Sequence, residues 1–286
     1  MGILKAHQIF DNTYLLAEEA GPALVTMALL IGSDRAILID SGCGITGTLP
    51  AFVRKQTDKP ILHLITHCDP DHAGASALFA DIHMSSADDD LKAMALPYAQ
   101  REGDILHALD SKPLLQKIVR FYLRRHMVKA EDFTYTDIRD GEEFLLSEQA
   151  GAYRQIEAFA MPGHTKGSMC FADKTNRIVF AGDSIAIRGN AVVGADRCAP
   201  LSVFRNALVR FAAKGFADYT IYTGHEYEPL PPGTVEELLS ACNEILAGQT
   251  QADKPGVPYF ADQTNPTGMM YHKHNAIGVF YQPKNL

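Results

Sequence analysis

Four side chains of types that commonly bind metal ions lie within six consecutive positions of this sequence. They are His67, Asp69, Asp71 and His72, and they follow residues 61–65, an apolar run with the length and composition of a buried strand. Two aspartates held beside two histidines would repel or lose solvation at a cost of several kcal/mol unless a cation balanced them. A solvated acidic loop with incidental histidines is the simpler alternative and the less favoured one. The spacing therefore predicts a metal site at the end of a strand.

Three further apolar segments end in a residue of the same kind. These residues are His164, Asp183 and His225, and a glycine directly precedes each of them. A single Gly-His or Gly-Asp pair after a strand is weak evidence, because such pairs also occur in ordinary turns and helix caps. Four strand ends together are far more specific, and seven nitrogen and oxygen ligands suit two divalent cations that share one carboxylate.

The elements that must position these side chains alternate between strands and helices. Apolar runs of strand length occupy residues 23–31, 36–40, 61–65, 143–146, 155–160, 177–181, 219–222 and 276–281. Helices are expected over residues 49–55, 73–79, 203–213 and 235–246, and the tail from residue 249 is otherwise rich in loop residues. Strands followed by helices in both halves favour an α/β architecture over an all-β sandwich. We predict a single domain over residues 1–286 with a helical insertion at about 88–130.

The order of the motifs resembles that of the metallo-β-lactamase-fold superfamily, whose pattern is His-x-His-x-Asp-His, then Gly-His, Gly-Asp and Gly-His. The resemblance covers about residues 23–225 and implies an αββα sandwich, in which two mixed β-sheets face each other with helices outside and metals at one edge. It implies a first metal held by His67, Asp69 and His164. It also implies a second metal held by Asp71, His72 and His225, a bridging Asp183, and an Asp40 that orients the ligands.

Two positions depart from the pattern of the lactamases themselves. Asp183 stands where those enzymes usually have a cysteine ligand, which points to the glyoxalase II, lactonase and flavo-diiron branches. Asp69 stands in place of the second motif histidine, and the flavo-diiron oxidoreductases likewise have a carboxylate there. A carboxylate makes the first site harder and more anionic, which shifts its preference from zinc toward iron or manganese. The expected cofactors are two divalent ions, zinc or iron, with manganese also compatible.

The leading functional hypothesis is a dinuclear metal-dependent hydrolase of a small ester, thioester, lactone or phosphoester. Two cations would lower the pKa of a bridging water so that hydroxide forms near neutral pH, and Asp71 is the expected catalytic residue that orients it. The alternative is a non-haem di-iron oxidoreductase that acts on oxygen or nitric oxide with a separate electron donor, and Asp69 motivates it. A non-catalytic sensor is less favoured, because the ligand set is intact.

Candidates for substrate contacts are fewer. Arg188 follows the bridging Asp183 and could hold a carboxylate or phosphate, since the guanidinium fork matches such groups. His272 and His274 are spaced like a metal pair and are further candidates for the pocket lining. The insertion at about 88–130 is expected to cap the metal edge and to form one wall of the pocket.

Composition limits the partners. The net charge of −8 and the pI near 5.7 argue against a nucleic-acid partner or an anionic membrane, which leaves a small-molecule substrate and allows a homodimer. The five cysteines are scattered, without a CxxC pair, which argues against a disulfide framework and fits a cytoplasmic location. No segment has the pattern of a signal peptide or a membrane span.

Overall fold

The computed structural model describes residues 4–20, 23–107, 109, 112–130, 132–147, 154–193, 197–258 and 268–286. The chain divides into two compact units. Unit 1 comprises Met1–Ile138 and Phe144–Gln155, and unit 2 comprises Arg139–Glu143 and Ile156–Leu286.

Unit 1 is built on a seven-stranded mixed sheet with the order β1-β2-β3-β4-β5-β6-β7. The first four strands pair antiparallel, and β4 to β7 pair parallel. The strands are β1 (Leu4–Phe10), β2 (Thr13–Ala20), β3 (Ala23–Ile31), β4 (Ala36–Ile39), β5 (Ile61–Leu64), β6 (Asp81–Met84) and β7 (Thr136–Asp137).

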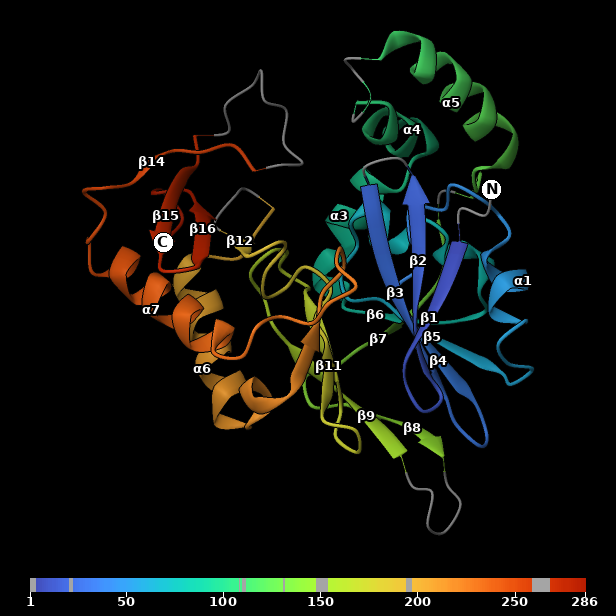
Figure 1. The fold of residues 1–286 in the computed structure, drawn as a ribbon, viewed down its shortest axis with the longest axis horizontal. Helices are drawn as coiled ribbons and strands as arrows, with labels where there is room; N and C mark the ends of the chain where they lie inside the picture. Colours follow the sequence, from blue (N-terminus) through green and yellow to red (C-terminus); the bar gives the residue numbers. More distant parts are fainter. Residues whose placement is uncertain are drawn as a thin grey trace. The chain divides into compact units, whose positions relative to one another are not determined.

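Five α-helices accompany this sheet among the described residues. They are α1 (Leu49–Val53), α2 (Pro70–Ala73), α3 (Asp89–Ala95), α4 (Tyr98–His107) and α5 (Pro113–His126), with short 3₁₀ turns η1 (Ser76–Leu78) and η2 (Ser86–Asp88). Figure 1 shows α4 and α5 as a helical pair at one end of the unit. The last three helices fall within the predicted insertion.

The register of two parallel strands decides where the first predicted ligands lie. Ile39 of β4 pairs with Leu64 of β5, and the amide of Asp40 donates to the carbonyl of Leu64 at 2.9 Å. The carboxyl ends of β4 and β5 therefore meet at one edge of the sheet. Asp40 and the segment that starts at Thr66 leave the sheet side by side.

Unit 2 contains two further mixed sheets. One has the order β13-β11-β10-β9-β8, and the other has the order β12-β16-β15-β14. Their strands are β8 (Glu143–Ser147), β9 (Arg154–Ala160), β10 (Met169–Asp173), β11 (Ile178–Phe180), β12 (Asn190–Val192), β13 (Thr220–Tyr222), β14 (Lys254–Pro255), β15 (Met270–His274) and β16 (Ile277–Tyr281). The chain passes between the units within β8 and β9, so these strands contain residues of both.

Two long helices belong to the described part of unit 2. They are α6 (Leu201–Ala213) and α7 (Thr234–Leu246), which lie next to each other in Figure 1, and η3 (Phe216–Asp218) follows α6. Leu238 and Ile245 recur at helical spacing on α7 and are buried in one apolar cluster with Phe204 of α6 and Val279 of β16. The amphipathic pattern that predicts α7 from the sequence therefore corresponds to its packed face.

The α/β class with mixed sheets is confirmed, and so are the strands predicted at residues 23–31, 61–65 and 276–281. The helix predicted at 73–79 is wrong in its limits, because α2 already begins at Pro70 and ends at Ala73. Proline lacks an amide hydrogen and has a fixed φ, so it favours the first helical position. The sequence patterns did not indicate β1, β2, β6, β7, β10, β12, β14 and β15, most of which are short or half-exposed.

Candidate metal centre

The ligand loop of unit 1 brings the four motif side chains together in pairs. His67 Nε2 lies 3.5 Å from Asp69 Oδ2, and His72 Nε2 lies 3.9 Å from Asp71 Oδ2. The two imidazole rings are 4.1 Å apart at their centroids. His67, Asp69 and His72 are buried, whereas Asp71 is partly exposed. Nitrogen and oxygen atoms of the four predicted ligands thus lie close together after the end of β5.

Asp40 determines which ring nitrogen of His67 and of His72 carries the hydrogen. Its carboxylate accepts from the Nδ1 of His72 and from the hydroxyl and amide of Thr66, each at 2.8 Å. The Thr66 hydroxyl donates its one hydrogen to Asp40. Toward His67 Nδ1, which lies 3.0 Å away, the hydroxyl oxygen is therefore the acceptor and Nδ1 is the donor. The Nε2 atom of each histidine is then left with a lone pair, as a metal ligand requires.

The backbone of residues 40–45 interlocks with α2. The amide of Ser41 donates to the carbonyl of His72 at 2.7 Å, and the amide of Gly74 donates to the carbonyl of Gly42 at 2.9 Å. Asp40 itself has a φ of 62°, in the left-handed region that Asp and Asn tolerate better than most residues. The orienting carboxylate therefore comes from a turn that is tied directly to the helix that bears His72.

Glu18 of β2 holds the same turn from the other side, and no motif in the sequence indicates this role. Its carboxylate accepts from the amides of Cys43 at 2.6 Å and Ile45 at 2.9 Å. Burial raises the pKa of Glu18 to about 7, although these backbone hydrogen bonds act in the opposite direction. A glutamate that follows the apolar residues Leu15 to Ala17 is the only sequence signal for it, and the exposed-type residue Glu19 beside it weakens that signal.

Unit 2 carries the other three predicted ligands. Asp183 Oδ2 lies 3.2 Å from His225 Nε2 and 3.9 Å from His164 Nε2, and both Asp183 and His164 are buried. Parallel pairing of β11 with β13 brings Asp183 and His225 together, since each follows the aligned end of its strand. Gly182 has a φ of 50°, which fits the sharp turn expected before a ligand. Gly163 is required for another reason, because a Cβ there would meet the ring of Phe204 at 2.4 Å.

Arg197 is a residue near this ligand set that the sequence did not indicate. Its Nη2 donates to His164 Nε2 at 3.0 Å. It lies in a loop remote from every motif, so no spacing argument could identify it. A guanidinium beside a predicted ligand histidine has the chemistry to hold an anionic group.

Comparison with solved structures decides the fold. The metallo-beta-lactamase family protein TTHA1429 from Thermus thermophilus aligns over 85% of this chain and 81% of its own length, with a TM-score of 0.56 and 21% identity. The DIM-1 metallo-beta-lactamase aligns over 85% of this chain and 99% of its own, with a TM-score of 0.55 and 14% identity. A sequence model described as the metallo-beta-lactamase superfamily matches residues 20–84.

This chain is a metallo-β-lactamase-fold protein.

Relatives of this metallo-β-lactamase-fold chain are named for different activities. It is 28% identical over 169 residues to the acyl-coenzyme A thioesterase MBLAC2 of Bos taurus, and 27% identical over 169 residues to that of Homo sapiens. Each match covers 55% of this chain and 57% of the relative, so the chain spans little more than half the length of these proteins. The chain is also 24% identical to the human mitochondrial persulfide dioxygenase ETHE1. This match covers 88% of the chain and 87% of ETHE1.

Within unit 1 of this metallo-β-lactamase-fold protein, α4 lies against the ligand loop. Arg101 of α4 is 1% exposed, and its guanidinium donates to the carbonyl oxygens of Gly74 at 2.8 Å and Val128 at 2.9 Å. Burial raises the pKa of Asp104 one turn further on, and the charges of Asp71 and Asp69 raise it further. The helical segment after the motif is thus packed beside it, while its role as a wall of the pocket stays a prediction.

The three substrate-contact candidates all lie in unit 2. Arg188 has a φ of 50° and forms part of the tight turn between Ile187 and Asn190. His272 donates from Nδ1 to Asp253 at 2.8 Å and from Nε2 to Glu244 of α7 at 2.9 Å. His274 bonds the same Glu244 at 2.9 Å. These two histidines therefore tie β15 to α7, and a substrate role for any of the three stays a prediction.

The His272 cluster predicts a pH-dependent stability. Burial alone would lower the pKa of His272, but its hydrogen bonds to Glu244 and Asp253 outweigh burial and raise this pKa above 6.5. The hydrogen bond from His272 in turn lowers the pKa of Glu244 below 4.5. The stabilisation from charged His272 is therefore complete below pH 6.5 and lost as pH rises through its folded pKa. We expect a loss of roughly 0.5–1 kcal/mol, after allowance for solvent screening.

Urea unfolding between pH 6 and pH 9 tests this expectation. His272→Gln should flatten the decline relative to the unaltered chain, and Lys273→Gln, which changes the exposed neighbour, should not. An unchanged slope in His272→Gln would contradict the assignment.

Proposed function

We propose that this chain is a dinuclear metal-dependent hydrolase of acyl thioesters. The observation that carries the proposal is the arrangement around Asp40, which leaves Nε2 of both His67 and His72 as acceptors beside Asp69 and Asp71. Histidines held in this way beside carboxylates form a donor set suited to divalent cations. The superfamily includes metal-dependent hydrolases and generally binds divalent metals.

The proposed ligands follow the superfamily pattern. His67, Asp69 and His164 would hold one cation, and Asp71, His72 and His225 the other, with Asp183 serving both. Support within unit 2 comes from Asp183 Oδ2, which has His225 at 3.2 Å and His164 at 3.9 Å, as a shared carboxylate would require. The buried carboxylates Asp69 and Asp183 favour a hard cation such as iron or manganese alongside zinc.

When bound, the cations would lower the pKa of a water molecule and polarise the thioester carbonyl. The remaining roles belong to the side chains of the chain itself. Asp71 is partly exposed and would orient the attacking water and accept its proton. Asp40 would keep His72 in its ligating tautomer. Arg197 donates to the Nε2 lone pair of His164, so it would turn away from that atom to an anionic group of the substrate when His164 holds a cation.

Thioesters are preferred over lactones and phosphoesters on one ground. The two MBLAC2 proteins are named as acyl-coenzyme A thioesterases, and they are 27–28% identical to this chain over 55% of its length.

A substrate screen tests the proposal. Protein purified without added metal should contain about two metal ions per chain. It should hydrolyse acyl-coenzyme A thioesters faster than lactones or phosphodiesters. Chelation should abolish the activity, and reconstitution should restore it. Hydrolysis that persists in fully chelated protein would contradict a metal-dependent mechanism, and a preference for lactones would contradict the substrate class.

One observation favours a second candidate, a non-haem iron oxidoreductase. Asp69 adds a carboxylate to the first ligand set, and the similarity to the persulfide dioxygenase ETHE1 extends over 88% of the chain. Oxygen consumption with a low-molecular-weight persulfide, in protein that contains iron and hydrolyses no thioester, would favour this candidate over the hydrolase.

A further inference from the structure

Helix α5 exposes a row of large apolar side chains. Leu114 is 73% exposed, and Ile118 and Phe121 are each 59% exposed. Their spacing of four and three residues places them on one face of the helix. Leu115, at 39%, lies at the edge of this face, and an open apolar depression is lined by Lys112, Pro113, Leu114, Leu115 and Ile118.

The opposite face of α5 is the one that packs on unit 1. Leu123 is fully buried in a cluster with Leu106 of α4 and Met127, and Val119 and Tyr122 are packed against the same cluster. The apolar face formed by Leu114, Ile118 and Phe121 is therefore not needed for the attachment of the helix. One side of α5 buries apolar residues in the protein, and the other side exposes apolar residues. Such an exposed apolar face indicates that it contacts an apolar partner outside the protein.

The charge along this segment contrasts with that of the whole chain. Six of the 26 lysines and arginines lie within residues 112–130, which contain no aspartate or glutamate, whereas the net charge of the chain is −8. The six are Lys112, Lys117, Arg120, Arg124, Arg125 and Lys129. At helical spacing, Lys117, Arg120 and Arg124 form a stripe that borders the apolar face.

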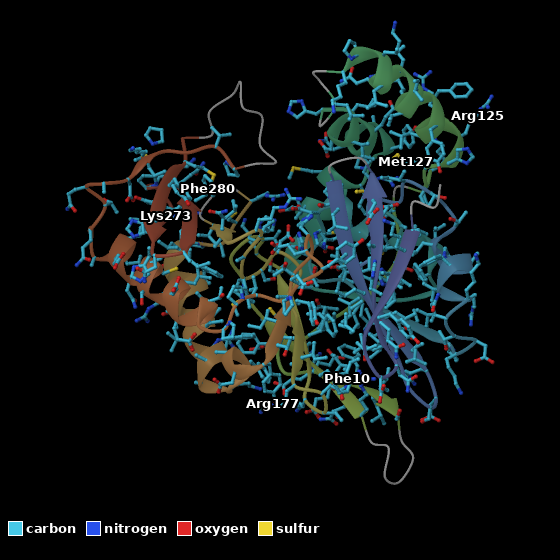
Figure 2. All side chains as sticks on the ribbon, in the orientation of Figure 1. Phe10, Arg125, Met127, Arg177, Lys273 and Phe280 are labelled. Carbon is cyan, nitrogen blue, oxygen red and sulfur yellow. The ribbon has the colours of Figure 1, made fainter. Side chains whose placement is uncertain are left out.

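Individual contacts show which cations remain available. Arg125 stacks over the ring of Phe121, with its Cζ 4.1 Å from the ring centroid, and it projects from the end of α5 in Figure 2. Arg124 lies 3.9 Å from Glu102 of α4. Lys117 and Arg120 are exposed on the stripe.

We propose that α5 is an interfacial membrane helix, which lies in the plane of an anionic bilayer with Leu114, Ile118 and Phe121 among the acyl chains. A helix that combines an apolar face with a bordering stripe of lysine and arginine has the chemistry of such a site. A second copy of the chain is a less suitable occupant, because two such helices would bring like charges together. The proposal differs from the sequence-based expectation of no membrane partner, which rests on net charge rather than on its local distribution.

Membrane attachment of this kind is peripheral. Among the helices of the described residues, none is both long and apolar enough to cross a bilayer. The proposal is independent of the proposed hydrolase function.

Vesicle sedimentation tests the apolar face. The full chain should pellet with vesicles of phosphatidylcholine containing roughly a third phosphatidylserine, and not with phosphatidylcholine alone. Leu114→Ser/Ile118→Ser/Phe121→Ser should lower the partition coefficient at least about tenfold. Val203→Ser/Val209→Ser, which alters exposed apolar residues of α6, should not change it.

The cationic stripe is tested in the same assay. Lys117→Gln/Arg120→Gln should lower the partition coefficient by about fivefold for each cation removed, and about 0.5 M salt should weaken binding of the unaltered chain. Lys55→Gln/Lys273→Gln removes equal charge from exposed positions elsewhere and should leave binding unchanged.

Fluorescence gives a second readout that does not depend on loss of binding. The chain contains no tryptophan, so Phe121→Trp supplies a single probe on the apolar face. Its emission should shift to the blue on addition of anionic vesicles, whereas that of Phe10→Trp, at the far end of unit 1 in Figure 2, should not. The proposal is overturned if anionic vesicles neither bind the chain nor shift Phe121→Trp. It is also overturned if sedimentation velocity shows a dimer that the triple serine variant abolishes.

Discussion

Asp183→Ala is expected to remove most of the bound metal and to lower thioester hydrolysis by at least about a thousandfold. Asp183 is buried, with His225 at 3.2 Å and His164 at 3.9 Å from one carboxylate oxygen. If it serves both cations, its loss weakens both sites, whereas His72→Ala should affect mainly one. Elemental analysis of the purified variants should therefore show less than about one ion per chain for Asp183→Ala and about one for His72→Ala.

A matched control separates this effect from a general loss of acidic charge. Asp218→Ala removes an exposed aspartate of the same unit and should retain full metal content and activity. Melting curves should show that Asp183→Ala stays folded, because removal of a carboxylate from among histidines creates no unpaired negative charge. Full metal content in Asp183→Ala would exclude it as a ligand.

Arg101→Met is expected to destabilise the chain by about 3–5 kcal/mol. The guanidinium is 1% exposed and donates to the carbonyl oxygens of Leu96, Gly74, Val128 and Ala130 at 2.8–3.1 Å. Methionine fills similar space but donates no hydrogen bond, so several buried acceptors would lose their donors. Urea unfolding curves of the unaltered chain and the variant measure the difference.

The control for this prediction lies on the next helix. Arg120→Met replaces an exposed arginine of α5 and should change stability by less than about 0.5 kcal/mol. Arg101→Lys should be intermediate, because an ammonium group keeps the charge but cannot reach all the carbonyls at once. A loss below about 1 kcal/mol in Arg101→Met would show that water replaces the guanidinium at these carbonyls.

The strand ends of this protein could be predicted well from the sequence. Residues 61–65 and 177–181 are apolar runs that end in ligand-type side chains, and β5 and β11 are there. Parallel pairing of β4 with β5 and of β11 with β13 then brings Asp40 beside Thr66 and Asp183 beside His225. An apolar run predicts such a strand because a strand inside a sheet that is covered on both faces needs apolar side chains along its whole length.

The residues that support the ligands could not be found in this way. Glu18 and Arg101 act through backbone groups far away in the sequence, 25 or more residues from Cys43 and from Gly74 respectively. Neither belongs to a motif, and each would ordinarily be assigned to the surface from its residue type. Arg197 likewise reaches His164 across 33 residues. Only the tertiary structure pairs such groups.

The interlocked turn at residues 40–45 also bears on how metal enters and leaves this protein. Ser41 is bonded to His72 of α2 and Gly42 to Gly74 just after it, both through backbone atoms, and Asp40 holds His72 through its side chain. These bonds are made between protein groups, so we expect that a cation bound at this half of the centre would spend little of its binding energy in ordering the chain, in contrast to zinc fingers, which are unfolded without their metal. If the proposed ligands bind metal, one ion should be exchangeable for another while the polypeptide stays folded, and the metal found in the cell would then follow supply as well as affinity.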